Sequence, residues 1–376
     1  MREKKIFPED ELTPRERVRL AVNLREADRC PIAPQLGFHA AHAGGISVRE
    51  FMTDGSKAAR ACRRAWLRYG GFDMPVIYFP AAYAFPFLPD AHSRFWNEWH
   101  IPEDDELPML LEKELLHNYD TLFTEGIITL ARTEKGKLLR EVGRMAMEAL
   151  RFLWEFLRTM PRLDYYGTYA GSLVNHPADL LAMWRGFDNF MLDLATEPQK
   201  VKEACEFMVD GLVEIGETLA RITGSRQVLV GVSRISGSFI SPRMFEEIFF
   251  ETFLRIVNRL NRDGFSITFH LDNDYTPMLD YFLEFPRKCG IMHLDQTDMF
   301  RAKEILGDHI CLMGNLHPGL LANGTPQEVE AACERLIKEV GAGGGFILAN
   351  ACEVPINAPF ENILAMKQAV RKWGWY

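Results

Sequence analysis

Three strand-like stretches, QVLVGVSRI at 227–235, SITFHLD at 266–272 and GIMHLD at 290–295, decide the fold, together with the helical stretch MFEEIFFETFLRIVNRL at 244–260. The short runs are rich in β-branched and other apolar residues, which is typical of buried strands. The longer stretch carries an apolar stripe with the period of an α-helix. Strand, helix and strand in this order predict a parallel sheet with crossover helices.

The same alternation extends along the chain. The pattern predicts further strands at 31–37, 73–79, 165–171, 310–316 and 346–352, which makes eight in all. Thr13 and Thr325 each open a helix as the first residue of a capping box, with Pro next and Glu three residues on, and Ser241 precedes Pro in the same way. Eight strands alternating with helices predict an α/β fold of the (β/α)8 TIM barrel type, with an open doubly wound sheet as the alternative.

The composition is even from end to end, without a low-complexity linker, so we expect a single domain over residues 1–376. Residues from about 101 to 160 show a 3.6-residue apolar period and little strand character. We interpret this segment as a helical insertion over one of the loops that follow the strands.

Charge and hydropathy exclude several function classes. The formal net charge is −9, and Lys and Arg are spread without a basic stripe, so no nucleic-acid partner is expected. No apolar run approaches the roughly 18 residues of a membrane span, and the first 20 residues have no signal-peptide core. Seven cysteines without CxxC spacing favour reduced thiols. A cytoplasmic protein is the resulting prediction.

The fifth predicted strand carries the most informative polar residues. In SITFHLD, the apolar side chains of Ile267, Phe269 and Leu271 alternate with polar ones, so they share one face. With the apolar face under the outer helices, His270 and Asp272 point inward at the end of the barrel where functional groups gather. An imidazole and a carboxylate so placed are suited to bind one metal ion. A His–Asp hydrogen bond that only fills the barrel is the alternative.

The eighth predicted strand adds a third ligand. Asn350 and Cys352 have the same parity as Phe346 and Leu348, so we expect both to emerge together at the strand exit. Together with His270 and Asp272, Cys352 gives zinc three protein ligands and leaves one position open, which is the catalytic arrangement. One zinc ion per chain is therefore predicted, and iron or cobalt would fit the same ligands.

Other polar and aromatic residues near the predicted strand ends form a set of candidate substrate-binding residues: His39, Tyr78, Tyr169, Arg234, His293, Asp295, Asn315 and Asn350. His293 and Asp295 would equally serve to orient the metal ligands. For Arg234, a salt bridge within the barrel is the alternative interpretation. The glycines at 341–345 precede a strand and match no nucleotide-binding pattern.

Several stretches resemble the uroporphyrinogen decarboxylase superfamily over nearly the whole chain. They are RERVRLAVNLREADRCPIAP at 15–34, SGSFISPRMFEEIF at 236–249, FHLDND at 269–274 and the long stretch from GNLHPG to KQAV at 314–370. The superfamily is built on a (β/α)8 barrel, in agreement with the strand count. It has two enzymatic branches, between which the residues must decide.

The decarboxylase branch has an arginine-rich motif of the MRQAGRYLPEY type at strand one and an aspartate at the exit of strand two. This sequence has PQLGFHAAHAGG at 34–45 and YFPAAYAF at 78–85 instead, without that arginine or aspartate. An acidic chain without those arginines is poorly suited to a porphyrinogen with eight carboxylates.

The other branch resembles zinc-dependent methyltransferases that act with a corrinoid protein and bind zinc through a His-x-Cys pair and a later Cys. His270 matches the histidine, Cys352 matches the later cysteine, and Asp272 replaces the first cysteine. A carboxylate in place of a thiolate favours polarising an oxygen. The resemblance therefore implies a zinc-dependent methyltransferase, with a small-molecule methyl donor such as a methoxylated aromatic and a corrinoid protein as partner. The aromatic-rich loop at 80–96 would cover such a ring, and a role in the core or in an interface is the alternative interpretation.

Two other functions remain open. One is a metal-independent decarboxylase acting on a tetrapyrrole or a smaller acid, in which Asp272 or Asp295 handles protons. The other is a non-catalytic barrel that binds a tetrapyrrole. A homodimer is an expectation from the resemblance alone, because no sequence feature defines an interface.

Overall fold

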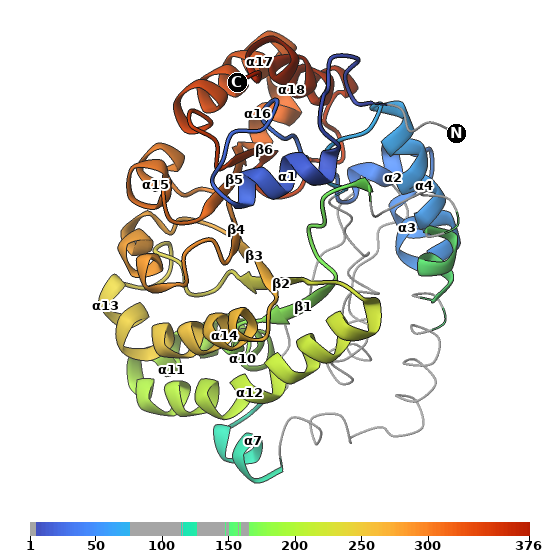
Figure 1. Cartoon of the computed structure of the whole chain (residues 1–376). Coiled ribbons are helices and arrows are strands. Elements are labelled where there is room, and N and C mark those ends of the chain that lie inside the picture. Colours follow the sequence, from blue (N-terminus) through green and yellow to red (C-terminus); the bar gives the residue numbers. More distant parts are fainter. Residues whose placement is uncertain are drawn as a thin grey trace.

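The computed structural model describes residues 5–75, 116–125, 150–156 and 165–376, together with residues 114, 147 and 158. Within them, six parallel strands form one sheet in sequential order (Figure 1). These strands are β1 (Ser172–Asn175), β2 (Gln227–Val232), β3 (Ser266–Leu271), β4 (Gly290–Leu294), β5 (Cys311–Leu316) and β6 (Phe346–Asn350). Sequential parallel neighbours require a crossover between every pair, as the sequence predicts.

Two segments that precede β1 close the sheet into a barrel. Ile32 forms a parallel bridge with Leu348 of β6. The backbone N–H of Asp73 donates to the carbonyl of Ile32 at 2.9 Å, and the N–H of Gly167 donates to the carbonyl of Asp73 at 3.0 Å. Backbone hydrogen bonds therefore continue from β6 through two neighbouring segments to the chain that leads into β1. The architecture is the TIM barrel that the strand count predicts.

The helices lie outside the strands (Figure 1). In the first half they are α1 (Pro14–Val22), α2 (His39–Ala43), α3 (Val48–Thr53), α4 (Gly55–Arg68), α7 (Tyr119–Glu125), α10 (Pro177–Arg185), α11 (Phe187–Thr196) and α12 (Pro198–Thr223). In the second half they are α13 (Pro242–Met244), the π-helix η2 (Phe245–Phe250), α14 (Glu251–Arg262), the 3-10 helix η3 (Thr276–Glu284), α15 (Met299–Leu306), α16 (Pro318–Asn323), α17 (Pro326–Arg335), the π-helix η4 (Leu336–Val340) and α18 (Phe360–Trp373). The capping boxes at Thr13 and Thr325 are confirmed, as is the Ser241 cap.

Two predicted strands differ from the structure. The prediction at 165–171 is wrong in its bounds, because regular pairing with β2 begins only where Ser172 meets Val228. Before that point the segment is bound by single hydrogen bonds, such as that from Gly171 N–H to the carbonyl of Gln227. At 31–37, where a strand is predicted, the structure has no regular strand but a bridge between Ile32 and Leu348. Residues 76–79 of the second predicted strand, the loop at 80–96 and most of the insertion at 101–160 lie outside the described residues.

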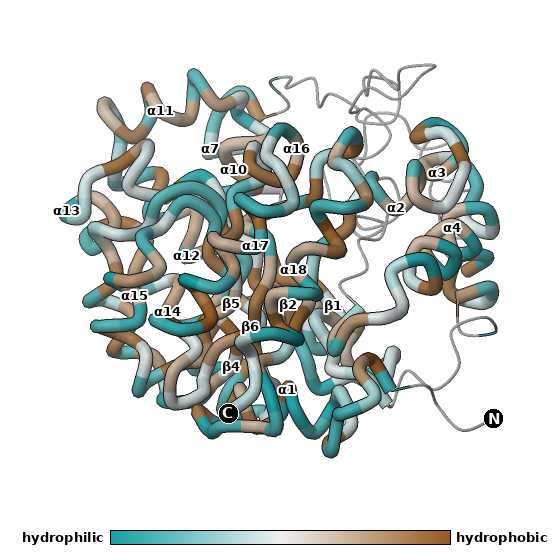
Figure 2. Tube along the Cα trace, turned by 90° about the horizontal axis from the view of Figure 1, so that it is seen from above, coloured by the Kyte–Doolittle hydropathy of each residue, from teal (hydrophilic) through white to brown (hydrophobic). Residues whose placement is uncertain are grey.

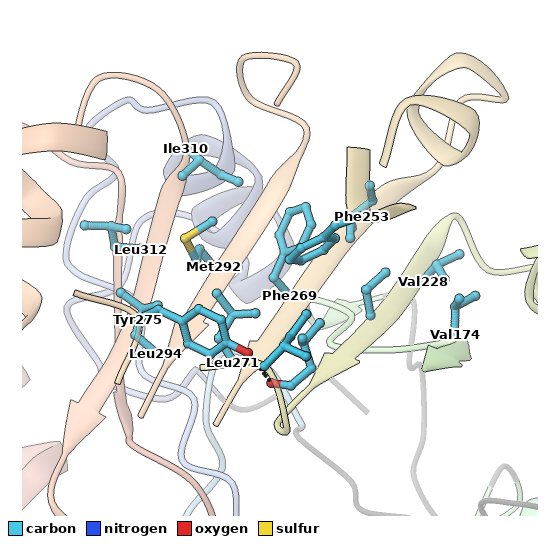
Figure 3. Close-up of a cluster of buried hydrophobic side chains, with 14 of the residues drawn as sticks. Val174, Val228, Phe253, Phe269, Leu271, Tyr275, Met292, Leu294, Ile310 and Leu312 are labelled. Atoms are coloured by element: carbon cyan, nitrogen blue, oxygen red, sulfur yellow. Dashed lines mark hydrogen bonds between the residues drawn. The ribbon is translucent and has the colours of Figure 1, made fainter. Parts of the chain in front are cut away.

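The hydrophobic core has an outer and an inner part. The outer cluster packs the strands against the helices and includes Phe253 of α14, Phe269 of β3 and Met292 of β4 (Figure 3). The inner cluster fills the barrel with Ala33, Met74, Tyr169, Ile291, Cys311, Met313, Ile347 and Ala349, and Val18 and Ala21 of α1 join it. Figure 2 shows hydrophobic residues along the strands and hydrophilic residues over much of the helical surface.

In the described part of the chain, no helix is both long enough and apolar enough to span a membrane.

A buried charge network holds the start of the barrel. Arg29 donates to Asp10 at 2.7 Å through Nε and to Asp73 at 2.7 Å through Nη1. Arg17 also donates to Asp73, and the other carboxylate oxygen of Asp73 accepts from the backbone N–H of Ile32 at 2.9 Å. Both arginines are fully buried. The network thereby ties the segment at 31–36 to the beginning of the second predicted strand.

Candidate metal centre

The exit of β3 carries two of the predicted ligands. Phe269 and Leu271 belong to the outer cluster (Figure 3). Phe269 stacks there on Phe285 with ring centroids 5.1 Å apart. His270, between them, points the opposite way and reaches the inner residue Tyr169. Asp272 follows with the same parity and lies 3.2 Å from His270 Nε2 through Oδ1. The alternation along this strand thus brings both side chains to the inner side of the barrel.

Cys352 reaches the same place by a different route from the one predicted. In β6, Ile347 and Ala349 face the inner cluster, whereas Phe346 and Leu348 belong to the outer one. The parity that Cys352 shares with Phe346 therefore leads away from the interior. Because β6 ends at Asn350 and the chain bends at residues 351–352, Cys352 turns back to within 3.9 Å of His270 Nε2. The prediction that Asn350 and Cys352 emerge on one face is wrong for this reason.

The three side chains offer a mixed set of donor atoms. One atom each from His270, Asp272 and Cys352 lies within 4.8 Å of the others, and all three residues are partly exposed. Ligands about 2.0–2.3 Å from a tetrahedral zinc ion lie about 3.3–3.8 Å from one another. The separations of 3.2 Å between His270 and Asp272 and 3.9 Å between His270 and Cys352 bracket this range. The residues therefore fit a zinc ion with one coordination position left for another ligand.

Two further side chains orient His270. The Tyr169 hydroxyl lies 2.8 Å from Nδ1 of His270 and 2.7 Å from Nδ1 of His293. His293 Nε2 lies 2.8 Å from the carbonyl oxygen of Asn350, which only accepts, so Nε2 must carry the proton and Nδ1 must accept. Tyr169 then donates to His293 and accepts from His270 Nδ1–H. This chain places the Nδ1 proton of His270 toward Tyr169, so Nε2, which faces Asp272 and Cys352, is the nitrogen that would bind a metal ion.

The charges around His270 favour a cation at this position. Burial alone would lower the pKa of His270, but electrostatic contact with Tyr169 and Asp272 raises it well above its usual range. Burial likewise opposes ionisation of Asp272, yet the neighbouring His270 holds the pKa of that carboxyl below its usual value. Burial also raises the pKa of the Cys352 thiol. A positive charge between His270, Asp272 and Cys352 would offset the cost of burying the ionised Asp272 carboxylate.

Other predicted residues border the site in supporting positions. Asp295 accepts from the backbone N–H of Asn273 at 3.0 Å, and its pKa is raised by burial. Asn315 donates to the carbonyls of Asp295 and Thr297 at 3.0 and 2.8 Å. Asn350 binds backbone atoms of Gln35 on both sides. The side-chain amides of these asparagines thus hold the chain at the strand exits.

Two of the remaining candidates contact residues other than the three proposed ligands. His39 opens α2, where its Nε2 lies 2.6 Å from the Tyr69 hydroxyl and its Nδ1 lies 3.1 Å from the carbonyl of Pro355. These partners engage both ring nitrogens, and a substrate-binding role of His39 stays a prediction. The Arg234 guanidinium lies 5.0 Å over the Phe187 ring. Tyr78 lies outside the described residues.

Two acidic residues at the site were not singled out from the sequence. Glu353 follows Cys352, and burial raises the pKa of its carboxyl to about 7. Its carboxylate lies where a Cβ on Gly37 would stand, and Gly37 has a φ of +51°, a conformation that favours glycine. Asp179 of α10 accepts from the backbone N–H groups of Ser233 and Arg234 at 2.9 and 2.7 Å, and burial raises its pKa to about 7. The adjacency of Glu353 to Cys352 was the available signal for Glu353, whereas Asp179 had none.

Known proteins resemble this chain in fold and sequence. The family model for uroporphyrinogen decarboxylase (URO-D) matches residues 132–373. The uroporphyrinogen decarboxylase of Coxiella burnetii (strain Dugway 5J108-111) is 30% identical over 87 residues, which are 23% of this chain and 24% of the relative. That of Psychromonas ingrahamii is 26% identical over 181 residues, which are 47% of this chain and 49% of the relative. The matches thus span less than half of these relatives.

Among solved structures, a methyltransferase from Methanosarcina mazei has the same fold. Its TM-score is 0.71, with 16% sequence identity, and the superposition covers 96% of this chain and 99% of the other. This likeness confirms the barrel architecture that backbone pairing shows. Because the URO-D family model matches more than half of the chain, the protein belongs to the uroporphyrinogen decarboxylase family, which is a family of enzymes.

Proposed function

We propose that this protein is a zinc-dependent methyltransferase that moves a methyl group from a small donor, such as a methoxylated aromatic, to a corrinoid on a partner protein. The observation that carries the proposal is the N, O and S donor set of His270, Asp272 and Cys352 at the end of the barrel strands. Such a set with an open position is typical of catalytic zinc sites. The fold of the Methanosarcina methyltransferase is consistent with this activity.

His270, Asp272 and Cys352 would hold the zinc ion. When bound, the ion would act as a Lewis acid on the ether oxygen of the donor. In the overall reaction, the bond between the methyl carbon and this oxygen breaks and its electron pair stays on the oxygen. A reduced corrinoid supplies the pair for the new bond to the methyl group, and the oxygen takes a proton as the demethylated product forms.

The residues of the chain prepare the site for this reaction. Tyr169 and His293 keep His270 in one tautomer, so the same nitrogen always faces the metal position. Asp272 supplies a hard oxygen ligand, which leaves a bound metal more electrophilic than a second thiolate would. Partial burial strengthens these electrostatic effects, since less water screens them than at the surface.

Metal analysis tests the proposal most directly. Protein purified without an affinity tag is measured by plasma mass spectrometry as wild type, His270→Ala, Cys352→Ala and His117→Ala. His117 is an exposed histidine and serves as the matched control. We expect about one zinc per chain in wild type and in His117→Ala, and loss of zinc in the other two variants. Full zinc occupancy in His270→Ala would contradict the ligand assignment.

A metal-independent decarboxylase is the second candidate, because the curated relatives described above carry that name. A substrate with many carboxylates is disfavoured at this site, because the carboxylates of Asp272, Asp295 and Glu353 border it and would repel like charges. Chelation separates the two functions. Methyl transfer from a methoxylated aromatic to a reduced corrinoid should stop when zinc is removed and return when it is added, whereas turnover that survives complete chelation would support the decarboxylase.

A further inference from the structure

Gln35 has a buried side chain without a hydrogen-bond partner. It is fully buried, and neither its Nε2 nor its Oε1 meets a partner among the described residues. Buried amide atoms are nearly always hydrogen-bonded, because nothing else compensates for their lost water. The backbone of Gln35, in contrast, is bound at both ends by Asn350, through Oδ1 at 2.8 Å and Nδ2 at 3.2 Å. Asn350 thus fixes the backbone of Gln35, whereas the amide nitrogen and oxygen of the Gln35 side chain stay available for hydrogen bonds.

The side chain of Gln35 faces the barrel interior. Along this segment, Ile32 and Leu36 belong to the outer cluster and Ala33 to the inner one. Gln35 has the parity of Ala33, so it faces the same way. Asn350, which binds the Gln35 backbone, also donates to the carbonyl of Cys352. Gln35 therefore lies beside the proposed metal ligand at the end of the barrel.

The charges nearby indicate which group this amide would bind. Glu353 stands over Gly37, two residues from Gln35, and accepts from the backbone N–H of Phe38. Asp272 and Asp295 follow β3 and β4, whose ends open at the same mouth of the barrel, so an anionic group there would meet several carboxylates. A glutamine amide is uncharged and has both a donor and an acceptor. It matches an uncharged group that also donates and accepts, and a hydroxyl is the simplest such group.

We propose that Gln35 is a substrate-binding residue whose amide holds an uncharged hydroxyl group of the substrate inside the barrel mouth. The inference rests on the proposed function for the class of compound that carries the hydroxyl. A buried polar group that serves binding has no hydrogen-bond partner in the ligand-free protein, so it lowers the stability of that state. Two measurements follow from this, one on stability and one on binding.

The first measurement compares the thermal midpoints of Gln35→Met and Thr252→Val. Thr252 on α14 is also buried, and its hydroxyl has no partner among the described residues, but it belongs to the outer helical layer. Each change removes unpartnered polar atoms at nearly constant size. We expect both variants to unfold at a higher temperature than wild type, by about 1–3 °C. A lower midpoint for Gln35→Met would show that the amide supports the fold and would overturn the proposal.

The second measurement compares two ligands by calorimetry, without the corrinoid partner. The probes are 2-methoxyphenol and methoxybenzene, which differ by one hydroxyl. We expect wild type and Thr252→Val to bind the phenol about tenfold more tightly, and Gln35→Met to bind the two within about twofold of each other. An unchanged preference in Gln35→Met would mean that the amide holds an ordered water only and would overturn the proposal. So would wild-type protein that binds neither probe.

The failures of the two proposals can be told apart. Neither measurement uses turnover, and the zinc content of every sample is determined separately. A wild-type protein without zinc or methyl transfer would contradict the proposed function. In that case, a Gln35→Met variant with a higher midpoint and a lost preference for the phenol would still support the role of Gln35.

Discussion

The hydroxyl of Tyr169 lies 2.8 Å from Nδ1 of His270, on the side of the ring opposite to Asp272 and Cys352. Tyr169 precedes β1, while His270 stands near the end of β3, so the contact crosses the barrel interior. Because Nδ1 of His293 accepts the hydrogen bond that the Tyr169 hydroxyl donates, the oxygen of Tyr169 is left to accept from His270. The proposed metal ligand is therefore oriented by a residue 101 positions away in the sequence.

Removing the Tyr169 hydroxyl should weaken metal binding without abolishing it. Tyr169→Phe leaves the three ligands in place but frees the His270 ring to rotate, so we expect zinc affinity to fall about tenfold to a hundredfold. A competition titration against a chelator measures this. Tyr281→Phe is the control, because its hydroxyl donates to the Glu246 carboxylate at 2.9 Å on the surface. Equal affinity in Tyr169→Phe and wild type would refute the orienting role.

Replacing the carboxylate ligand by a thiolate should preserve the site but change its chemistry. Asp272→Cys is expected to retain zinc, because thiolates are strong zinc ligands, and to show stronger thiolate-to-metal absorption than wild type when cobalt(II) is substituted. Methyl transfer from an ether should slow, since the metal becomes less electrophilic. Asp272→Ala is the comparison, with weaker metal binding. A zinc-free Asp272→Cys protein would indicate that Asp272 is no ligand.

The stability of the protein should fall in mild acid because of His39. Burial lowers the pKa of His39 to about 4, so the folded state keeps this ring neutral while the unfolded chain binds a proton below a pKa of about 6.5. Stability from this group is present above pH 6.5 and is lost as the pH falls toward 4. Between pH 7 and pH 5 we expect a loss of about 2 kcal/mol.

Urea unfolding of wild type and His39→Gln at both pH values isolates this contribution. The variant should be less stable at pH 7, since two buried hydrogen bonds change, but its stability should depend less on pH by about the same 2 kcal/mol. An identical pH dependence in both proteins would assign the effect to other groups, of which His176 is the first candidate because burial lowers its pKa to about 3.

The buried charge network at the start of the barrel should be costly to break. Arg29→Met leaves Asp10 and Asp73 buried with fewer cationic partners, and we expect a loss of about 3–5 kcal/mol of unfolding free energy. Arg243→Met is the matched control, because Arg243 pairs with Glu247 on the surface, where such a pair is worth less than about 1 kcal/mol. Similar losses in the two variants, measured by denaturant unfolding, would argue against the network as the main anchor.

Local patterns in the sequence were sufficient for much of the barrel. Helix caps at Thr13, Ser241 and Thr325 depend on residues three or four apart, and the structure confirms them. Strand alternation likewise predicts that His270 and Asp272 point inward, since each strand residue faces opposite to its neighbours. Strand bounds were less predictable, because the start of β1 depends on where β2 runs beside it.

The sequence by itself determined the alternation of strands and helices, the inward direction of His270 and Asp272 and the choice of candidate metal ligands. Only the tertiary structure decided how Cys352 joins them. Strand alternation no longer applies after β6 ends at Asn350, and a bend then brings Cys352 to His270, 82 residues away in the sequence. It also decided which partners His39 contacts, that Tyr169 lies against His270 and that the buried amide of Gln35 has no partner among the described residues. Closure of a barrel joins residues from distant strands, and no pattern of neighbouring residues contains that information.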